Sequence, residues 1–449
     1  MAGEWRTIPA ERFCSSVRDG THDSPKPANR GRFLVTSRHI IGGQLDLASA
    51  YLISEADFDA INKRSKVDRW DVLVSMIGTV GELCLIKKEP DFAIKNIGLF
   101  KSKGETEGKW LYYYLRSPHA QQLIREQSRG TTQQYIPLGT LREFPIPIPD
   151  EEKEMRAIAH ILGTLDDKIE LNRRMNETLE AISRAIFKSW FVDFDPVHAK
   201  AEGRDPGLPK PIADLFPDSF EDSDLGEIPK GWEIKSFAAT VEIIGGGTPK
   251  TNVLEYWDGE IPWFSVADAP RETDVWVVET EKSITQTGVE NSSTRILPEG
   301  STTISARGTV GKIALVGVPM AMNQSCYGLR GKVGRHGFFT YFGTRELVSS
   351  LKQRSHGSVF DTITRDTLAG VEVVVPPATL VEAFEQVVHP MLERIRANLF
   401  GCHALAALRD TLLPKLISGE LRVKDAKRFS DRGVGRSVRS QRAGRERNS

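Results

Sequence analysis

The sequence predicts an α+β fold in which two mixed α/β globules, arranged in tandem, alternate with two long helices. Two observations lead to this prediction. In residues 150–193, apolar residues recur at alternating spacings of three and four, the period of one face of an α-helix. An offset of 226 residues then places this segment on a second helical segment, so the order is globule, helix, globule, helix. A repeat of this length is too long for a solenoid and is typical of a duplicated domain pair.

The first helix should be about 60 Å long at ~1.5 Å per residue. Asp150 is the expected N-cap, and Glu151 and Glu152 lie where the helix dipole favours anions. A stripe of this length requires a partner along its whole length, and the repeat supplies one, so we predict that the two long helices pack against each other as a coiled coil. The expected packing residues are Ile158, Leu162, Leu165, Ile169, Asn172, Leu179, Ile182, Ile186 and Trp190 in the first helix and Met391, Ile395, Asn398 and Leu405 in the second.

Asn172 and Asn398 occupy equivalent positions on or beside these stripes. A polar side chain in such a seam costs stability, but it can fix the register because a shifted pairing leaves it without a hydrogen-bond partner. If the helices pack antiparallel, the symmetry of the duplication permits the two residues to lie near one another, although the sequence does not establish that they touch. The alternative is that both lie at the edge of the stripe in contact with water.

The predicted organisation has six segments. Residues 1–149 form the first globule, 150–193 the first long helix, 194–230 a Pro-, Gly- and acid-rich linker, 231–377 the second globule, 378–423 the second long helix, and 424–449 a basic tail that we expect to be disordered. Short strand-like runs alternate with turns in the first globule, and residues 110–127 form one amphipathic helical segment.

Two of these segments carry further signals. Leu215, Phe216 and Phe220 should anchor the linker to a surface. The second helix should begin at a capping box, be interrupted by two breakers and stop at a glycine. The residues concerned are Thr379 and Glu382 for the box, Pro390 and Gly401 for the interruptions, and Gly419 for the stop.

Composition indicates a soluble cytoplasmic protein that does not enter a membrane. The chain of 449 residues is 39% hydrophobic, which is enough for two sizeable cores. Its four cysteines are isolated, and it has neither a signal peptide nor an apolar run of about 18 residues. Net charge is zero, and the globules carry 21 basic against 18 acidic residues in 1–150 and 14 against 16 in 231–377. Any grip on DNA must come from local clusters or partner subunits.

Two loops of the first globule concentrate hydrogen-bonding side chains, residues 19–26 (DGTHDSPK) and residues 128–134 (SRGTTQQ). Gln, Thr, Ser and Arg can read base edges, and loops hold them away from the core. Ordinary solvated turn chemistry is the alternative. With their repeats, the loops give the candidate nucleic-acid contacts: Thr21, His22, Ser24, Lys26, Arg129, Thr131, Thr132, Gln133, Thr248, Lys250, Arg307, Ser358 and Thr362.

Several motif matches fail as catalytic sites. Pro217, Asp218, Glu233 and Lys235 spell a nuclease-like PD…ExK pattern, but half of it lies in the predicted linker. GGGTPKT has Pro249 where a phosphate loop requires glycine. The two GTVG strings, residues 78–81 and 308–311, mark tight turns between strands, because neither opens a long helix. FDPV, residues 194–197, does not match a methyltransferase loop. We therefore expect no catalytic residue and no metal site.

The chain resembles the DNA-specificity subunits of type I restriction-modification systems. The matching motifs are GTHDSPK, SARGTVGKIAL, the block ILGTLDDKIELNRRMNETLEAISRAIFKSWFVDFDPV, GEIPKGW, GGGTPK and LLPKLISGEL, which cover both halves. The resemblance implies two target recognition domains that each read one half of a bipartite double-stranded DNA site, with two antiparallel helices as the spacer. It also implies docking of two methyltransferase subunits and of endonuclease/translocase subunits. Half-site spacing is then set by the geometry of the protein.

The same resemblance implies a non-catalytic subunit. It would bind no cofactor itself, and partner subunits would use S-adenosylmethionine, ATP and Mg²⁺. The second interpretation is a coiled-coil assembly or scaffold protein whose globules bind protein. The donor-rich loops of the duplicated globule separate the two, because a pure scaffold does not need them.

Overall fold

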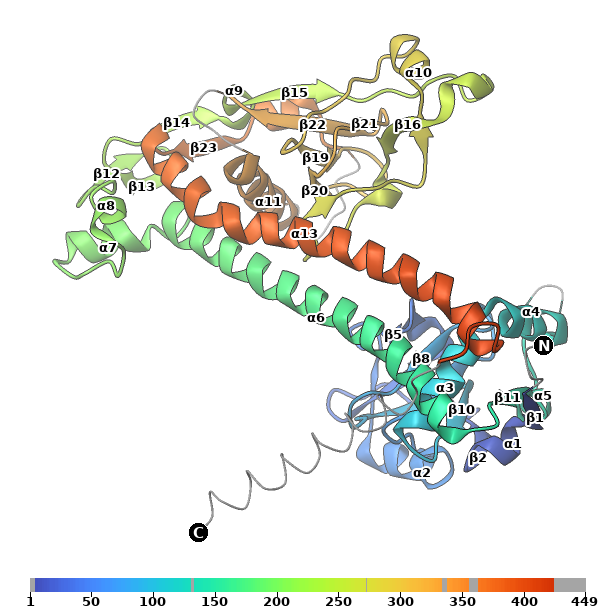
Figure 1. Cartoon of the computed structure of the whole chain (residues 1–449). Coiled ribbons are helices and arrows are strands. Elements are labelled where there is room, and N and C mark those ends of the chain that lie inside the picture. Colours follow the sequence, from blue (N-terminus) through green and yellow to red (C-terminus); the bar gives the residue numbers. More distant parts are fainter. Residues whose placement is uncertain (1–4, 131–132, 272, 333–336, 355–361, 424–449) are drawn as a thin grey trace. The chain divides into compact units, whose positions relative to one another are not determined.

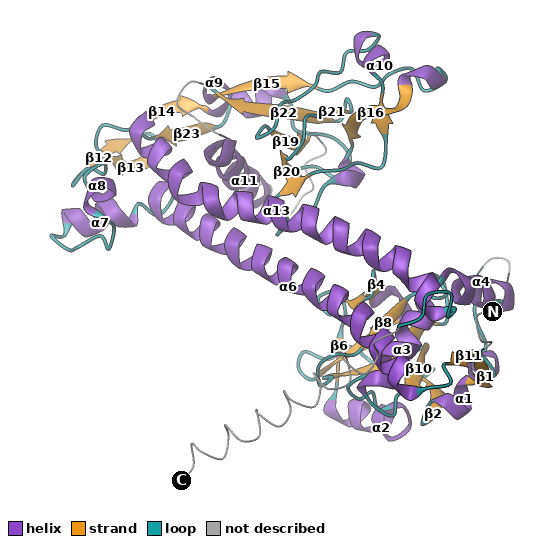
Figure 2. Ribbon diagram, viewed as in Figure 1, coloured by secondary structure: helices purple, strands orange, loops and turns teal. Residues whose placement is uncertain are grey.

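The structure is a computed structural model, and it describes residues 5–130, 133–271, 273–332, 337–354 and 362–423. The predicted basic tail, residues 424–449, lies outside this part. The chain divides into two compact units: Met1–Lys168 with Leu405–Ser449, and Ile169–Ala404. Each unit combines a mixed α/β globule with portions of the two long helices (Figure 2).

The duplicated long helix is confirmed. Helix α6 (Glu152–Phe191) and helix α13 (Ala378–Ile417) each have 40 residues, and both ends are related by the offset of 226. Helix α6 starts later than expected, because Glu154 and Met155 donate their N–H groups to the Glu151 carbonyl, at 3.0 and 3.5 Å. Glu151 therefore occupies the cap position, and Asp150 lies before it.

Two predictions about the start and middle of α13 are wrong. The helix begins at Ala378, and the Pro377 carbonyl accepts from the N–H groups of Leu380 and Val381, at 3.1 and 3.3 Å. Thr379 and Glu382, the expected capping box, therefore lie within the first turn, and Pro377 supplies the first bonds.

The expected interruptions are absent from α13, which is continuous through Pro390 and Gly401. Val388 and Leu392, which flank the proline, are fully buried, so side-chain packing holds the helix where the proline removes one backbone bond. The predicted stop is confirmed: Gly419 has φ +76°, and the Leu421 N–H closes on the Lys415 carbonyl at 2.9 Å.

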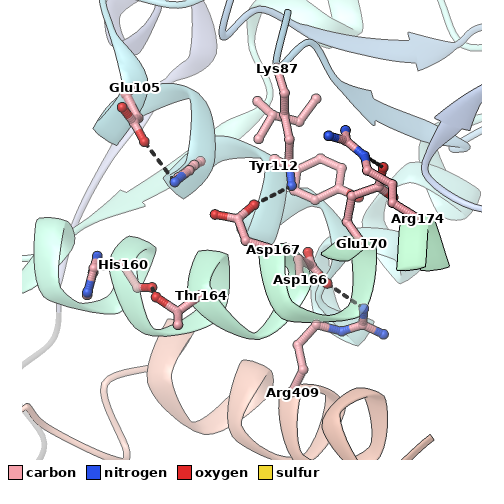
Figure 3. Close-up of polar contacts among 12 residues, drawn as sticks. Lys87, Glu105, Tyr112, His160, Thr164, Asp166, Asp167, Glu170, Arg174 and Arg409 are labelled. Carbon is pink, nitrogen blue, oxygen red and sulfur yellow. Dashed lines mark hydrogen bonds and ion pairs between the residues drawn. The ribbon is translucent and has the colours of Figure 1, made fainter. Parts of the chain in front are cut away.

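The two helices are antiparallel in each unit (Figure 1). In the unit of residues 169–404, Ser183 lies opposite Met391, and Asn176 lies opposite Asn398. In the other unit, Asp166 pairs with Arg409 at 2.6 Å (Figure 3). Further towards the start of α6, Glu154 pairs with Arg422, which follows α13, at 2.7 Å. Residue numbers fall along α13 as they rise along α6, which confirms the predicted orientation.

The two equivalent asparagines are buried, at 7% exposure for Asn172 and 5% for Asn398, so the water-edge alternative is wrong. They do not bond each other. Asn398 Nδ2 donates to Asn176 Oδ1 at 2.9 Å, while Asn172 hydrogen-bonds the side chain of Cys402. Cys402 is the repeat equivalent of Asn176, so these two contacts are copies of one another. In an antiparallel pair of repeated helices, a residue faces its own repeat equivalent at one point only, where the local two-fold axis crosses the pair. Asn172 and Asn398 lie to either side of that point, so they do not face each other.

The buried face of α6 also differs from the predicted stripe in its second half. Ile182 is 44% exposed, and the neighbouring Ser183 is fully buried instead. Asn176 and Glu180 complete this polar part of the face, and Glu180 bonds Arg345 at 2.5 Å. The apolar pattern alone therefore predicted a face that is displaced by one residue in this half of α6, because hydrogen-bonded polar side chains occupy the buried positions.

The first globule contains a four-stranded antiparallel sheet in the order β2-β10-β7-β8 and a three-stranded sheet in the order β6-β3-β9, in which β3 and β9 are parallel. Strand β1 pairs with β11, and β4 with β5. The bounds are β1 Arg6–Pro9, β2 Ser16–Asp19, β3 Arg32–Thr36, β4 Ile40–Ile41, β5 Gln44–Leu45, β6 Leu52–Ile53, β7 Val72–Ser75, β8 Leu83–Leu85, β9 Phe92–Lys95, β10 Ile97–Lys101 and β11 Pro145–Ile148. The helices are α1 Ala10–Phe13, α2 Glu55–Ser65, α3 Glu105–Arg116, α4 Pro118–Gln127 and α5 Leu138–Arg142.

The second globule repeats this plan. Its sheets have the orders β15-β22-β19-β20-β17 and β18-β16-β21, with β16 and β21 parallel, and β14 pairs with β23. The bounds are β14 Glu233–Ser236, β15 Val241–Gly245, β16 Trp257–Phe264, β17 Trp276–Val277, β18 Ser283–Ile284, β19 Thr302–Ser305, β20 Ile313–Val316, β21 Ala321–Met322, β22 Cys326–Gly331 and β23 Glu372–Val375. The helices are α9 Phe237–Thr240, α10 Gln286–Glu290, α11 Gly337–Arg354 and α12 Arg365–Ala369. The duplication therefore extends from sequence to strand order.

The single helical segment expected at residues 110–127 is two helices, α3 and α4. Ser117 ends the first and caps the second, since its Oγ accepts from the Ala120 N–H at 3.3 Å, and Pro118 occupies the first turn. The linker holds more structure than expected: α7 Asp195–Ala201, α8 Lys210–Ala213 and the hairpin β12 Phe220–Ser223 with β13 Gly226–Pro229. Its anchoring is confirmed, because Phe216 is buried and Leu215 and Phe220 are partly buried against an aromatic core.

Each unit has a main core built on both long helices. In the first, Ile158 and Leu162 of α6 and Leu413 of α13 pack with Trp110 of α3. In the second, the repeat equivalents Phe384 and Val388 of α13 pack with Phe187 and Trp190 of α6. Each fully buried side chain of this size contributes roughly 1.5–3 kcal/mol relative to exposure.

A buried carboxyl group fixes the start of α11 on α13. Glu385 of α13 accepts from the Phe339 N–H at 2.7 Å, and burial raises its pKa to about 7. The Glu385 side chain thus accepts from an N–H group in the first turn of α11, as an N-cap side chain does, although it belongs to a neighbouring helix.

The Asn176–Asn398 bond gives a direct test of the helix register. Replacing Asn398 by Leu leaves the Asn176 carbonyl oxygen buried and unpaired, so we expect the free energy of unfolding to fall by about 1–3 kcal/mol. Replacing both residues by Leu should recover most of that loss. Chemical denaturation of the full chain measures both changes. The exposed Asn29→Leu is the control, and equal losses in the single and double variants would show that the amide bond is not the cause.

Candidate nucleic-acid interface

The connections of the four-stranded sheet in the first globule converge at one end. Because the strands are antiparallel, Asp19 at the end of β2, Ile97 at the start of β10 and Ser75 at the end of β7 lie next to one another. We call this the loop end of the sheet. It carries the loop after β2, residues 20–31, and the β7–β8 turn, residues 76–82. The second predicted contact loop, residues 128–134, must also reach this end if the two loops are to act on one surface.

The second predicted loop does reach it. Ile77 of the turn forms a bridge with Tyr135, and the Gly78 N–H donates to the Gln134 carbonyl at 3.0 Å. Arg129 forms a further bridge on the other side of Tyr135. The loop after β2 and the loop between α4 and α5 thus lie at the same end of the sheet, with the β7–β8 turn between them.

The second globule has the same arrangement. Gly245 at the end of β15, Cys326 at the start of β22 and Ser305 at the end of β19 meet at the loop end of its sheet. Arg307 in the β19–β20 turn, residues 306–312, bridges Thr362, in the position that Ile77 and Tyr135 occupy in the first globule. The loop after β15, residues 246–253, takes the place of residues 20–31.

One serine shapes the turn in each globule. Ser75 Oγ donates to the Thr79 carbonyl and accepts from the Glu82 N–H at 2.8 Å. The equivalent bonds join Ser305 to Thr309 at 2.6 Å and to Lys312 at 2.8 Å. The glycines at both ends of each GTVG string have φ between +78° and +94°, a region that disfavours other residues. The prediction that GTVG marks tight turns between strands is confirmed.

Four of the predicted contact residues are held by hydrogen bonds to residues of their own globule. Thr21 Oγ1 accepts from the Asp23 N–H at 3.1 Å. His22 lies between Asn96 Oδ1 at 2.8 Å and Asp19 Oδ2 at 3.0 Å, and Ser24 accepts from Lys95. In the second globule Thr248 donates to Gln324. These contacts give the loops a defined shape, as the alternative of turn chemistry also requires.

Other predicted residues are exposed and have free polar groups. Within the described residues, the side chains of Lys26, Gln133, Arg129 and Arg307 form neither ion pairs nor hydrogen bonds. Lys250 is also exposed, and Thr362 is half-buried beside Arg307. Thr131, Thr132 and Ser358 lie outside the described residues. Arg129 also lines a hollow of about 680 Å³ between the end of α4 and the start of α5.

Sequence reasoning missed the residues that support these loops. Asn96 has φ +53° and holds His22, and Lys95 holds Ser24. Gln324 has the same role for Thr248. Lys95 and Asn96 lie just before β10, and Gln324 lies just before the equivalent strand β22. The one signal in the sequence was Asn96 itself, because asparagine tolerates the left-handed conformation in turns. Tyr135, 43% exposed at the centre of the loop end, carried no signal beyond its type.

The described residues do not bring the motif matches together into a catalytic or metal site. Glu233 and Lys235 of the nuclease-like string pair with each other on β14. Across the described ranges, no group of three or more His, Cys, Asp or Glu side chains could hold a metal ion. None of the helices in the described part of the chain combines the length and apolar composition of a membrane span.

The family model for the type I restriction modification DNA specificity domain matches residues 46–181 and 229–386, once in each globule. The chain belongs to this family. Both matches include the paired strands that carry the GTVG turn, β7 and β8 in the first and β19 and β20 in the second, and together they cover most of the chain. The duplication seen in sequence and strand order is therefore a duplication of the specificity domain.

Individual relatives are distant. A type I restriction enzyme HindI specificity subunit from Haemophilus influenzae is 28% identical over 67% of this chain and 73% of its own. The MjaIX specificity subunit from Methanocaldococcus jannaschii is 26% identical over 71% and 70%. The crystal structure of a type I restriction-modification S subunit from M. genitalium superposes with a TM-score of 0.55 over 92% of this chain and 96% of the other, at 16% identity. This last likeness shows a shared fold.

The free side chains at the loop end should separate into two kinds. Gln133→Ala should lower the preference for the target sequence over other DNA by about 1–3 kcal/mol if the amide bonds a base edge. Lys26→Ala should weaken binding to all sequences and reduce the salt dependence by about one counterion, because an ammonium group contacts phosphate. Equilibrium binding of the assembled complex to target and scrambled duplexes at several salt concentrations measures both effects.

Lys103→Ala is the matched control for Lys26, since Lys103 is exposed beyond the opposite end of β10. If it weakens binding as much as Lys26→Ala, the loop end is not the DNA-binding surface.

Proposed function

We propose that this specificity subunit reads a bipartite double-stranded DNA target, one half-site per globule, and that the long helices set the distance between the half-sites. The observation that carries the proposal is the duplicated loop end, which presents free Gln, Lys and Arg side chains in the first globule and free Lys and Arg in the second. Side chains of these types supply both phosphate and base-edge contacts.

The chain recognises DNA sequence within a type I restriction-modification system, as its family membership indicates. The scaffold interpretation is not favoured, because both family matches fall on the globules with their loop ends. The division into half-sites follows from the duplication: two readers of one ancestry but different loop residues suit two different short sequences. A spacer of two 40-residue helices, each about 60 Å long, suits an uncontacted gap between them.

The partners and the chemistry belong to the same proposal. We infer that two methyltransferase subunits and endonuclease/translocase subunits dock on this chain, and that the chain itself is not an enzyme. S-adenosylmethionine, ATP and Mg²⁺ would then be bound by the partner subunits. The type I restriction enzymes named among the relatives support this assignment.

Exchanging one globule tests independent reading. Residues 1–149 are replaced by the equivalent part of another type I specificity subunit, and α6 and α13 are retained. We expect one half of the methylated sequence to change and the other to remain, because each loop end reads its own half-site. Sequencing of methylated genomic positions gives the answer. The reciprocal exchange of residues 231–377 should change only the other half, and a change in both halves from either exchange contradicts the proposal.

Lengthening both helices tests their role as the spacer. Four residues are inserted after Arg174 and after its repeat equivalent Phe400, so that the antiparallel pair stays in register. One extra turn of about 6 Å should lengthen the preferred gap by about two base pairs of ~3.4 Å each. Methylation of a library of sites with varied gaps measures the preference.

The control for this experiment is a four-residue insertion in the β12–β13 hairpin after the exposed Asp224, which should leave the gap unchanged. A paired-helix insertion that stays active with the original gap would show that the helices do not set the distance.

A further inference from the structure

The β7–β8 and β19–β20 turns share four identical residues, Gly-Thr-Val-Gly, at 78–81 and 308–311. The positions around them differ: Ile77 and Glu82 in the first globule correspond to Arg307 and Lys312 in the second. The turn lies between the two predicted contact loops at each loop end. An identical exposed turn surrounded by changed residues requires a reason that both globules share.

The fold explains three of the four residues. Gly78 and Gly81 have φ +80° and +94°, and a Cβ on Gly81 would come within 3.2 Å of Ile124 in α4. Val80 is partly buried against the core of the first unit. In the second globule the glycines have φ +78° and +79°, and Val310 packs in the same way. These residues are fixed by the geometry of the turn.

The fold does not explain the threonine. Thr79 and Thr309 are exposed, and within the described residues neither the hydroxyl nor the N–H group of either donates a hydrogen bond. Only the main-chain carbonyl is engaged, by the Oγ of Ser75 or Ser305. That bond holds the peptide, so each threonine presents two donors to solvent from a fixed backbone.

We propose that Thr79 and Thr309 each donate to a phosphate group of the DNA backbone and place their globule on its half-site. The proposal rests on the function proposed above. If the globules read different sequences, an identical residue cannot specify the bases of both, whereas the phosphate backbone is the same in each half-site. Arg129 and Arg307, which form no ion pair within the described part of the chain, lie close in the fold to the two turns and favour an anion there.

A double-mutant cycle between protein and DNA tests the contact. The variants are Thr79→Val and Thr309→Val, which keep the β-branched shape but remove the hydroxyl donor, and the DNA carries a single uncharged methylphosphonate at successive positions of each half-site. With the assembled complex, we expect Thr79→Val to lower affinity several-fold, up to about tenfold, for target and scrambled duplexes alike. Thr309→Val should have an effect of the same size.

One methylphosphonate position per half-site should reproduce this loss in the wild type and add little to the loss in the matching variant. Thr79→Ser retains the hydroxyl and should bind like the wild type, which separates the lost donor from a disturbed turn. Gln133→Ala, in the adjacent loop, is the sequence-specific control and should lose affinity for target DNA alone.

Two outcomes overturn the inference. If Thr79→Val loses affinity only for the target sequence, the residue reads a base. If it binds all DNA like the wild type, or fails only to assemble with the methyltransferase subunit, the turn does not contact phosphate. Failure of the proposed function is recognised separately, because the wild-type complex would then not distinguish its target from scrambled DNA.

Discussion

The packing of one helix against its own repeat is the constraint on which the rest of the structure depends. Leu413, near the end of α13, completes the core that Ile158 and Trp110 begin in the first globule. Phe187 of α6 does the same for the core around Phe384. Each main core therefore needs the other long helix in addition to its own globule and the helix that follows that globule. The core of the first unit is complete only when Leu413 packs with Ile158, more than half the chain away in sequence. Bringing such distant residues together costs loop-closure entropy and slows folding.

The central part of the helix pair is built differently from these cores. Asn176, Glu180 and Ser183 of α6 are buried where a coiled coil would have apolar side chains. Each has a partner, and the Glu180–Arg345 pair ties α6 to α11 of the second globule. Polar groups of this kind stabilise little in comparison with apolar packing, but a shift of one turn would separate Asn176 from Asn398, so this pair opposes alternative registers. The apolar cores therefore supply most of the free energy of folding, and the buried polar residues favour one alignment of α6 against α13.

The features that sequence predicted and those that it missed follow from the range of the interactions involved. The repeat, the lengths of α6 and α13, the stop at Gly419 and the GTVG turns depend on local period and backbone conformation, which residue types record. The wrong predictions at Pro390 and Ile182 depend on what lies across the helix interface, and so do the hydrogen-bond partners of the correctly predicted buried Asn172 and Asn398. Val388 and Leu392 keep α13 continuous, and the offset of the antiparallel axis gives Asn398 a different partner. No local pattern contains that offset.

The candidate site divides in the same way. Loop composition identified Lys26, Gln133 and Arg129, whose side chains are free, but it identified Thr21, His22 and Ser24 equally, and these already hydrogen-bond other residues of the first globule. Residue type states what a side chain can donate, and only its neighbours determine whether that capacity is already used. The convergence of two loops and a turn at one sheet end depends on strand order, which no local signal gives.

Charge sets a further limit on how such a surface can work. Neither globule is strongly basic, and the whole chain has no net charge, so non-specific attraction through many phosphate contacts is weak in this subunit alone. Few free cations at each loop end leave neutral donors, the amide and hydroxyl groups, to contribute a larger share of the recognition. Such contacts depend on distance and direction more than on ionic strength, and therefore on a backbone held in place. The serine-fixed turns and the hydrogen-bonded loops provide such a backbone, and under the proposed function we expect the remaining attraction for DNA to come from the partner subunits.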